Sequence, residues 1–282
     1  KVANIDIVSC FSREGSNNLT KFCDRFELPK AETEADFLRE CSEVDAVFVA
    51  LKTEHTLTVL TKLEGIAKFV FFEKPGAFHW TDFEKLTKSS TKYFSLYNRR
   101  FYKPVQFLKD AILKSSNQLN LNFNFPDTQK GWHQFYINGC HMVDLLMYLL
   151  DDFLLDIKCA LSAGPEAGFT FIAESKDGHI VTFVNPWGGA ETASLIVYDG
   201  STTYKLQPIE CLKISTEMSV TEPSTELPVR SYNPKVSKEI MVDADFKPGF
   251  FEQINEAKKI VIEGKKATAL GTLAQSIAVV KF

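Results

Sequence analysis

The first third of the chain alternates short apolar runs with segments of helical periodicity. The apolar runs at 5–11, 45–51 and 67–72 predict strands. After Asp45 and Lys68, the last two runs are continuously apolar, as in strands covered on both faces. Between the first two runs, 17–26 and 34–44 place their apolar residues on one helical face.

The alternation continues to residue 98. Thr53 is expected to cap a third helix, 81–90 is predicted to be helical, and 92–98 is predicted to be a strand. Strands that alternate with helices predict a parallel sheet with right-handed crossovers.

The pattern changes after residue 100. Segment 119–125 alternates strictly between apolar and polar residues, which predicts a strand with one solvated face. Strand-like segments separated by turn signals fill about 155–245. Helices are predicted at 104–115, 141–150, 249–264 and 267–282. The expected fold combines α/β and α+β parts: a parallel-sheet domain at 1–98 and a mostly antiparallel, open-sheet domain at 99–282.

Composition and charge narrow the possible partners. The chain has a net charge of −4, a sequence pI near 5.8 and no block of Lys or Arg, so neither a nucleic-acid nor a membrane partner is expected. No apolar run is long enough to cross a bilayer, and the first residues do not have the pattern of a signal peptide.

The cysteines and histidines do not form a metal-binding pattern. The six cysteines are scattered without a Cys-x-x-Cys pair, and the five histidines include no His-Glu-x-x-His motif. We therefore expect reduced thiols in a cytoplasmic protein and no metal site.

The first candidate functional residues, Glu73-Lys74-Pro75, directly follow the apolar run FVFF. Ligands of open parallel sheets bind outside the carboxyl ends of the strands. Lys74 at such an end could bind an anionic or hydroxyl group, or move a proton. The alternative is an ordinary charged loop.

Two further blocks favour a functional Lys74 over an ordinary charged loop. They are Tyr97-Asn98-Arg99-Arg100-Phe101 and the segment GCHMVDLLMYLL at 139–150. In this order and spacing, the three blocks resemble the Gfo/Idh/MocA family of NAD(P)-dependent sugar oxidoreductases. The resemblance extends over nearly the whole chain and implies a Rossmann-like domain followed by a substrate-binding and oligomerisation domain.

The resemblance also implies roles for individual residues. Lys74 matches the catalytic lysine, the bond before Pro75 is expected to be cis, and His141 matches the histidine that faces the reacting carbon. A packed or helix-capping histidine is the alternative for His141. The expected cofactor-binding residues are Ser12, Arg13, Thr53, Glu73, Pro75 and Asn98. The expected substrate-binding residues are Arg99, Tyr136, Asn138 and Asp144. For Asp144, orientation of its helix or a local contact is favoured over a role in the chemistry.

Cofactor choice depends on the residues after the run 5–11. Ser12 and Arg13 suit a 2′-phosphate and favour NADP, whereas Glu14 keeps NAD as the alternative.

The sequence departs from the family in three places. It has no Gly-x-Gly-x-x-Gly motif and starts where the family's second strand starts, so we expect that residues exist upstream of Lys1. Ile137 stands where relatives carry an aspartate, and His133, Tyr136 or Asn138 could take that polar role. The loop at 51–53 lacks the usual Thr-Pro-Asn, which puts its ribose contacts in doubt.

The expected function is hydride transfer between NAD(P) and a sugar, sugar derivative or cyclitol, with Lys74 and His141 as catalytic residues. The alternatives are a non-catalytic regulatory or scaffolding relative and a sugar-binding module. Apolar residues on both faces of the second-domain strands predict a homodimer or homotetramer through that sheet.

Overall fold

The computed structural model describes residues 5–12, 17–162, 164, 167–243 and 246–282. The chain divides into two compact units. The first unit comprises residues 1–97 and 250–282, and the second comprises residues 98–249. Each unit is built around a sheet of its own.

The first unit contains a four-stranded sheet in the order β1-β2-β3-β12. The strands are β1 (Val47–Val49), β2 (Phe69–Glu73), β3 (Lys92–Leu96) and β12 (Gly271–Thr272). The first three strands are parallel, and β12 pairs antiparallel with β3. Bulky apolar side chains fill β2, as expected for an inner strand that is covered on both faces.

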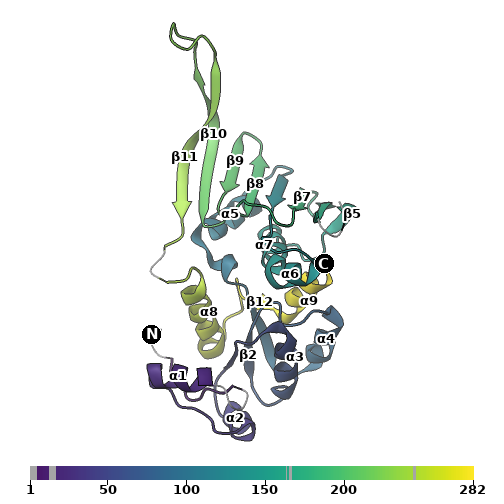
Figure 1. Cartoon of the computed structure of the whole chain (residues 1–282), viewed down its shortest axis with the longest axis vertical. Coiled ribbons are helices and arrows are strands. Elements are labelled where there is room, and N and C mark those ends of the chain that lie inside the picture. Colours follow the sequence, from purple (N-terminus) through teal and green to yellow (C-terminus); the bar gives the residue numbers. More distant parts are fainter. Residues whose placement is uncertain (1–4, 13–16, 163, 165–166, 244–245) are drawn as a thin grey trace. The chain divides into compact units, whose positions relative to one another are not determined.

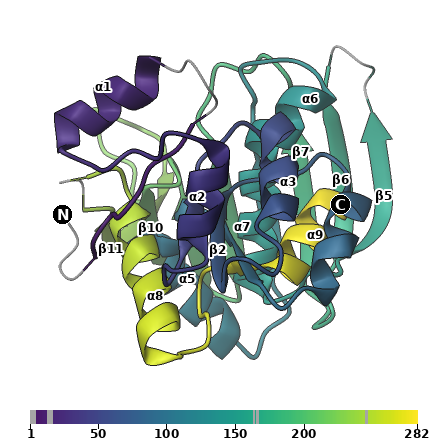
Figure 2. The ribbon, with the colours of Figure 1, turned by 90° about the horizontal axis from the view of Figure 1, so that it is seen from below.

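Helices cover the sheet of the first unit. They are α1 (Asn17–Phe26), α2 (Glu34–Cys41), α3 (Thr53–Lys62), α4 (Trp80–Glu84), the 3₁₀ helix η1 (Lys85–Lys88), α8 (Phe250–Glu263) and α9 (Leu273–Lys281). Residues of α2, α3, α4 and α9 pack on one face of the sheet in a single apolar core (Figure 2). Side-chain caps help to start two of these helices, at Thr33 before α2 and at Thr272 before α9.

The second unit contains an eight-stranded sheet in the order β11-β10-β9-β8-β4-β7-β6-β5 (Figure 1). Its strands are β4 (Asn120–Asn124), β5 (Asp156–Ser162), β6 (Phe169–Glu174), β7 (Ile180–Asn185), β8 (Ser194–Asp199), β9 (Thr202–Leu206), β10 (Cys211–Thr221) and β11 (Ser231–Met241). All neighbouring pairs are antiparallel except β4 and β7. Together with the parallel first sheet, this confirms the predicted fold class.

The helical segments of the second unit are the 3₁₀ helix η2 (Asn98–Phe101), α5 (Lys103–Lys114), α6 (Trp132–Gln134), the π-helix η3 (Phe135–Gly139) and α7 (Cys140–Leu150). Helices α5 and α7 contact each other, and every residue of α7 except His141 is buried. Within the described ranges, no helix is both long and apolar enough to cross a membrane.

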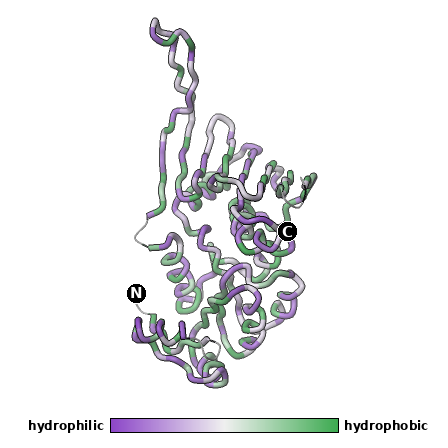
Figure 3. The backbone as a smooth tube through the Cα atoms, viewed as in Figure 1, coloured by the Kyte–Doolittle hydropathy of each residue, from purple (hydrophilic) through white to green (hydrophobic). Residues whose placement is uncertain are grey.

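Strands β10 and β11 form a hairpin that extends past the rest of the sheet. They pair with each other from Cys211 to Met241, whereas β9 pairs only with the start of β10. Hydrophilic and hydrophobic positions alternate along the hairpin (Figure 3). Its outer part therefore has one apolar face, with Met218, Val220 and Tyr232 about half exposed.

The C-terminal segment 250–282 does not belong to the unit in which we expected it. We expected residues 99–282 to form the second domain, but 250–282 pack with the first unit. The reason is that this segment supplies β12 to the first sheet and α9 to its core. The Ser276 hydroxyl also donates a hydrogen bond to Ser95 Oγ on β3, at 2.7 Å.

Candidate functional site

The turn that follows β2 carries the predicted catalytic lysine. β2 ends at Glu73, and the peptide bond between Lys74 and Pro75 is cis, as the family resemblance implied. Gly76 has φ 83°, and a Cβ atom there would overlap the Phe72 ring. The turn is therefore fixed by packing, while Glu73 and Lys74 are only half-buried.

A second predicted residue lies at the same sheet edge. β1 and β2 are parallel with Val49 opposite Phe72, so both strands end at one edge. Thr53 is the first residue of α3, directly after β1, and Lys52 rather than Thr53 occupies the N-cap position. The carboxyl edge of the first sheet therefore carries Thr53, Glu73, Lys74 and Pro75.

The predicted strand at 5–11 does not form. Cys10 makes an isolated parallel bridge with Lys30, and Ile5, Ile7 and Val8 are exposed. An apolar run becomes a strand only with a hydrogen-bonded neighbour, and the described residues offer this run a partner only at Lys30. Ser12 is half-buried outside the sheet, and Arg13 and Glu14, the other residues of the cofactor-choice prediction, lie outside the described residues.

His141 lies in a helix that begins earlier than predicted. The helical segment starts at Trp132, passes through the π-helix η3 and continues as α7. Gly139 is required in this wide turn, because a Cβ atom there would penetrate the Phe135 ring. π-helical turns often occur at functional sites. Tyr136, Asn138 and His141 are half-buried in or next to this one.

Asn98 and Arg99 lie in η2 at the start of the second unit. The Asn98 amide donates hydrogen bonds to the Pro248 carbonyl at 3.0 Å and to the Tyr102 hydroxyl at 3.3 Å. Its carbonyl oxygen is thus the group left for the predicted cofactor contact. Arg99 is half-buried, and its Nη1 has no hydrogen-bond partner in the described part of the chain.

The structure corrects the predicted substrate-binding role of Asp144. This residue is 1% exposed, and its two carboxylate oxygens bind the guanidinium of Arg100, which is equally buried. Burial raises the pKa of the Asp144 carboxyl, and the Arg100 charge opposes that effect. Asp144 therefore belongs to a structural ion pair within the second unit.

Neighbouring groups complete this ion-pair cluster. The Arg100 guanidinium lies over the rings of Tyr148 and Phe153, at 5.0 and 5.6 Å from their centroids. The Gln106 amide donates to the Arg100 carbonyl and to the Tyr148 hydroxyl. The Lys109 ammonium also lies over the Tyr148 ring, with Nζ 3.8 Å from the ring centroid.

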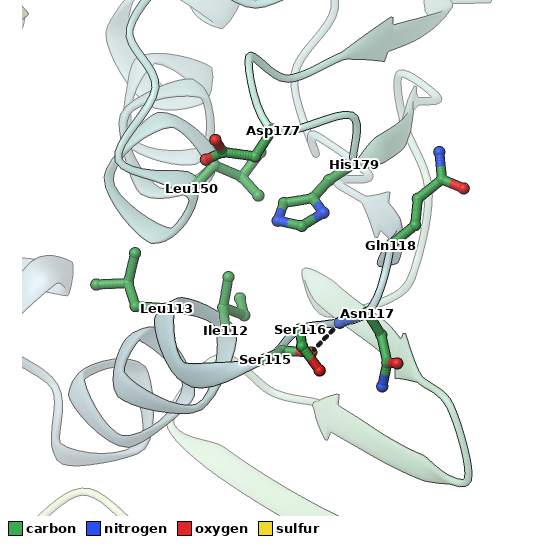
Figure 4. A pocket seen from close by; sticks show the side chains of 9 residues that line it. All are labelled: Ile112, Leu113, Ser115, Ser116, Asn117, Gln118, Leu150, Asp177 and His179. Carbon is green, nitrogen blue, oxygen red and sulfur yellow. Dashed lines mark hydrogen bonds between the residues drawn. The ribbon is translucent and has the colours of Figure 1, made fainter.

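A pocket of about 480 Å³ in the second unit contains none of the predicted residues (Figure 4). It lies between the end of α5, residues 115–118 and the turn before β7. His179 points into it, and its Nδ1 accepts a hydrogen bond from the Leu119 N–H at 3.2 Å. No motif in the sequence marks this pocket, because its polar lining comes from separate loops.

Cysteine chemistry is limited in this structure. All six cysteines are free thiols. Burial raises the pKa of the Cys10 and Cys41 thiols to about 11, so both stay protonated at neutral pH. Among the described residues, no group of three or more His, Cys, Asp or Glu side chains could hold a metal ion.

Comparison with known proteins shows that the chain is similar in fold to solved structures. No protein-family model matches the chain, and no curated protein matches its sequence. Solved structures of Gfo/Idh/MocA-type oxidoreductases are similar to it, which confirms the resemblance at the level of the fold.

Three solved structures illustrate this similarity. A super-repressor mutant of Gal80p from Saccharomyces cerevisiae has a TM-score of 0.74 at 11% identity, over 99% of this chain and 86% of that one. An oxidoreductase domain protein from Kribbella flavida has a TM-score of 0.73 at 13% identity, over 98% and 85%. GenD2 from gentamicin A biosynthesis, in complex with NAD, has a TM-score of 0.67 at 15% identity, over 98% and 84%.

Proposed function

We propose that this protein is an NAD(P)-dependent oxidoreductase that acts on a carbinol carbon of a sugar, sugar derivative or cyclitol. The observation that carries the proposal is the turn Glu73-Lys74-Pro75 at the carboxyl end of an inner parallel strand, in a chain with the fold of solved oxidoreductases. This sheet edge is where ligands of open α/β sheets bind.

The residues present fit one half of a nicotinamide dinucleotide. Thr53, Glu73 and Lys74 offer a hydroxyl, a carboxylate and an ammonium group at one sheet edge, next to Pro75, which suits a ribose and a nicotinamide. The diphosphate would need the backbone N–H groups of a Gly-x-Gly-x-x-Gly turn, and this motif is absent from the 282 residues. The NAD complex of GenD2 supports the class of cofactor. NADP remains our preference on Ser12 and Arg13.

The protein's own residues would handle the proton. A bound nicotinamide supplies or accepts the hydride. The Lys74 ammonium would bind the substrate oxygen and stabilise negative charge that develops on it. The His141 imidazole would take or return the hydroxyl proton, and Arg99 and Asn138 would orient neighbouring hydroxyls.

The direct test of the proposed function is a fluorescence titration of the full-length gene product with NADPH and NADH. We expect saturable binding with a preference for NADPH. A folded protein that binds neither nucleotide would contradict the proposal.

A substitution then tests the role of Lys74. Lys74→Ala should abolish polyol-dependent reduction of NADP⁺, whereas Lys88→Ala, an exposed lysine in η1 of the same unit, should leave the rate unchanged. Equal rates in the two variants would remove Lys74 from the mechanism.

A second candidate function is that of a non-catalytic regulator. Ile137 cannot exchange a proton or orient a hydroxyl, and one structure of similar fold is named as a super-repressor rather than as an enzyme. In that case Lys74→Ala would leave the biological activity of the protein unchanged.

We also propose a cytoplasmic homo-oligomer that assembles through the second sheet. Alternate residues on the sheet face opposite the apolar core include the exposed Leu161, Ile172 and Tyr198. Light scattering at micromolar concentration should give a dimer or a tetramer, and Ile172→Glu should shift it toward the monomer. A monomeric unsubstituted protein would contradict this assembly.

A further inference from the structure

The pocket of about 480 Å³ in the second unit lies where α5 and α7 end (Figure 4). The last turn of α5 and the final residue of α7 supply an apolar wall, made of Ile112, Leu113 and Leu150. Residues 115–118 and the turn between β6 and β7 supply polar groups. A concave site of this size with an apolar wall and a few polar groups is typical of small-molecule binding.

His179 directs a hydrogen-bond donor into this pocket. Its side chain points into the pocket, and the residue is 9% exposed. Nδ1 accepts a hydrogen bond from the Leu119 N–H, and a neutral imidazole whose Nδ1 accepts carries its proton on Nε2. Nε2 has no hydrogen-bond partner in the described part of the chain. The pocket therefore contains an N–H group that lacks an acceptor.

Asp177 adds a carboxylate without a counter-ion. The residue is exposed, and it makes no hydrogen bond or ion pair with the described residues. The adjacent Lys176 is bound elsewhere, since its Nζ donates to the Asp151 carbonyl at 2.6 Å, and Lys114 at the end of α5 does not line the pocket. The C-terminus of α5 adds the partial negative charge of a helix dipole. The pocket therefore favours a cationic group.

We infer that this pocket binds a small amino alcohol, that is, a primary amine with a neighbouring hydroxyl group and an apolar body. The ammonium group would donate to the Asp177 carboxylate, and the hydroxyl oxygen would accept from the His179 Nε2–H. The apolar body would pack against Ile112, Leu113 and Leu150. Leu113 is 54% exposed, so apolar surface is available for this contact.

The two polar groups together select this class of ligand. An alcohol without an amine would satisfy His179 and leave the Asp177 charge without a counter-ion. A free amino acid would bring a second carboxylate next to Asp177, and like charges at short distance repel. A hydroxyl group accepts from His179 without that repulsion.

The inference goes beyond the proposed function and does not depend on it. Every lining residue belongs to the second unit, and none of the proposed catalytic or cofactor-binding residues is among them. Binding at this pocket can therefore be measured without a nucleotide or a polyol, and its failure would leave the oxidoreductase proposal standing.

The experiment is a calorimetric titration of the full-length protein with leucinol, an amino alcohol with a branched apolar chain. Isohexanol lacks its ammonium group, isoamylamine lacks its hydroxyl group, and leucine carries a carboxylate in place of the hydroxyl. We expect leucinol to bind at least about tenfold more tightly than each of these three, since each unmet polar contact weakens binding.

No binding of leucinol in the millimolar range, as for a pocket that holds water alone, would overturn the inference. Equal binding of isohexanol or isoamylamine would also overturn it, because the ammonium or the hydroxyl would then make no contact. Tighter binding of leucine would exclude a hydroxyl as the preferred acceptor.

Two variants place the binding at these residues. Asp177→Asn keeps the size of the side chain and removes its charge, and His179→Phe keeps a ring and removes the donor. Each should weaken leucinol binding about tenfold or more. Asp110→Asn is the matched control, because Asp110 is an exposed carboxylate of α5 that does not line the pocket. Because His179→Phe also removes the acceptor of the Leu119 N–H, its folding is checked by urea denaturation. Unchanged binding in Asp177→Asn would contradict the assignment.

Discussion

Two clusters of buried polar side chains in the second unit are built on opposite principles. In the ion-pair cluster, the Arg100 guanidinium binds both carboxylate oxygens of Asp144 and lies over two aromatic rings. In the other cluster, Asp127, Asn185 and Trp187 are also buried, yet each has one polar atom without a hydrogen-bond partner in the described chain. We call the Arg100–Asp144 cluster saturated, because its hydrogen-bonding groups are paired, and the Asp127–Asn185–Trp187 cluster unsaturated. A saturated cluster stabilises a fold. An unsaturated cluster lowers stability and leaves polar atoms able to bind a ligand or water.

The largest loss of stability should come from breaking the ion pair in the Arg100–Asp144 cluster. Asp144→Asn would leave the Arg100 charge buried without a counter-ion, and should lower the free energy of unfolding by about 3–5 kcal/mol. Urea denaturation measures this loss. Asp151→Asn is the control, because its ion pairs with Lys109 and Lys176 are long and partly exposed, and it should cost less than about 1 kcal/mol. Similar losses in the two variants would show that the buried Arg100–Asp144 pair contributes no more to stability than the partly exposed ion pairs of Asp151.

A smaller loss of stability should come from the π-helical turn η3, between α6 and α7. Gly139→Ala would place a methyl group inside the Phe135 ring and should destabilise the protein by about 1–3 kcal/mol through overpacking. Thermal unfolding measures the loss. The matched control is Gly65→Ala, where positive φ adds strain but no atom lies within 4 Å of the new Cβ. A smaller loss for Gly139→Ala than for Gly65→Ala would show that the turn relaxes freely.

Substitution in the unsaturated cluster should not lower the free energy of unfolding as Asp144→Asn does. Asp127→Asn replaces a buried carboxyl group that makes no ion pair with the described residues, and it keeps the hydrogen bond from the Gln129 N–H. The free energy of unfolding should therefore stay within about 1 kcal/mol of the original or rise. A loss as large as that of Asp144→Asn would make Asp127 a structural residue.

The smallest effect concerns pH. Burial lowers the pKa of Lys109, and nearby Asp151 only partly opposes this shift. As pH rises, the folded protein releases this proton before the unfolded chain does, at about pH 10.4, so the unfolded state then binds more protons and stability increases. Unfolding curves between about pH 8 and 10 should show this increase in the unsubstituted protein and not in Lys109→Gln. An equal pH slope in the two proteins would show that Lys109 titrates normally.

Much of the fold could be predicted from the sequence, because its signals are local. The apolar run at 69–72 and the strict alternation at 119–125 both became strands, β2 and β4. The run at 5–11 did not, since strand formation also needs a neighbour with which to pair. The place of 250–282 in the first unit depends on long-range contacts that periodicity does not encode.

The candidate site was less predictable. The Glu73-Lys74-Pro75 turn was located correctly at a strand end, because a charged sequence after an apolar run marks such an end. For Asp144, a local role was the alternative to substrate binding, but its motif does not show that Arg100 is the group that binds its carboxylate. The cluster of Asp127, Asn185 and Trp187 could not be predicted, because only the register of β4 and β7 brings these residues together.

The oxidoreductase account can be tested most directly by the initial rate of NADPH formation from NADP⁺ and a polyol by the full-length protein. The account predicts a measurable rate that falls to background in Lys74→Ala and is retained in Lys88→Ala. A folded protein that shows no polyol-dependent rate with either NADP⁺ or NAD⁺ would contradict it.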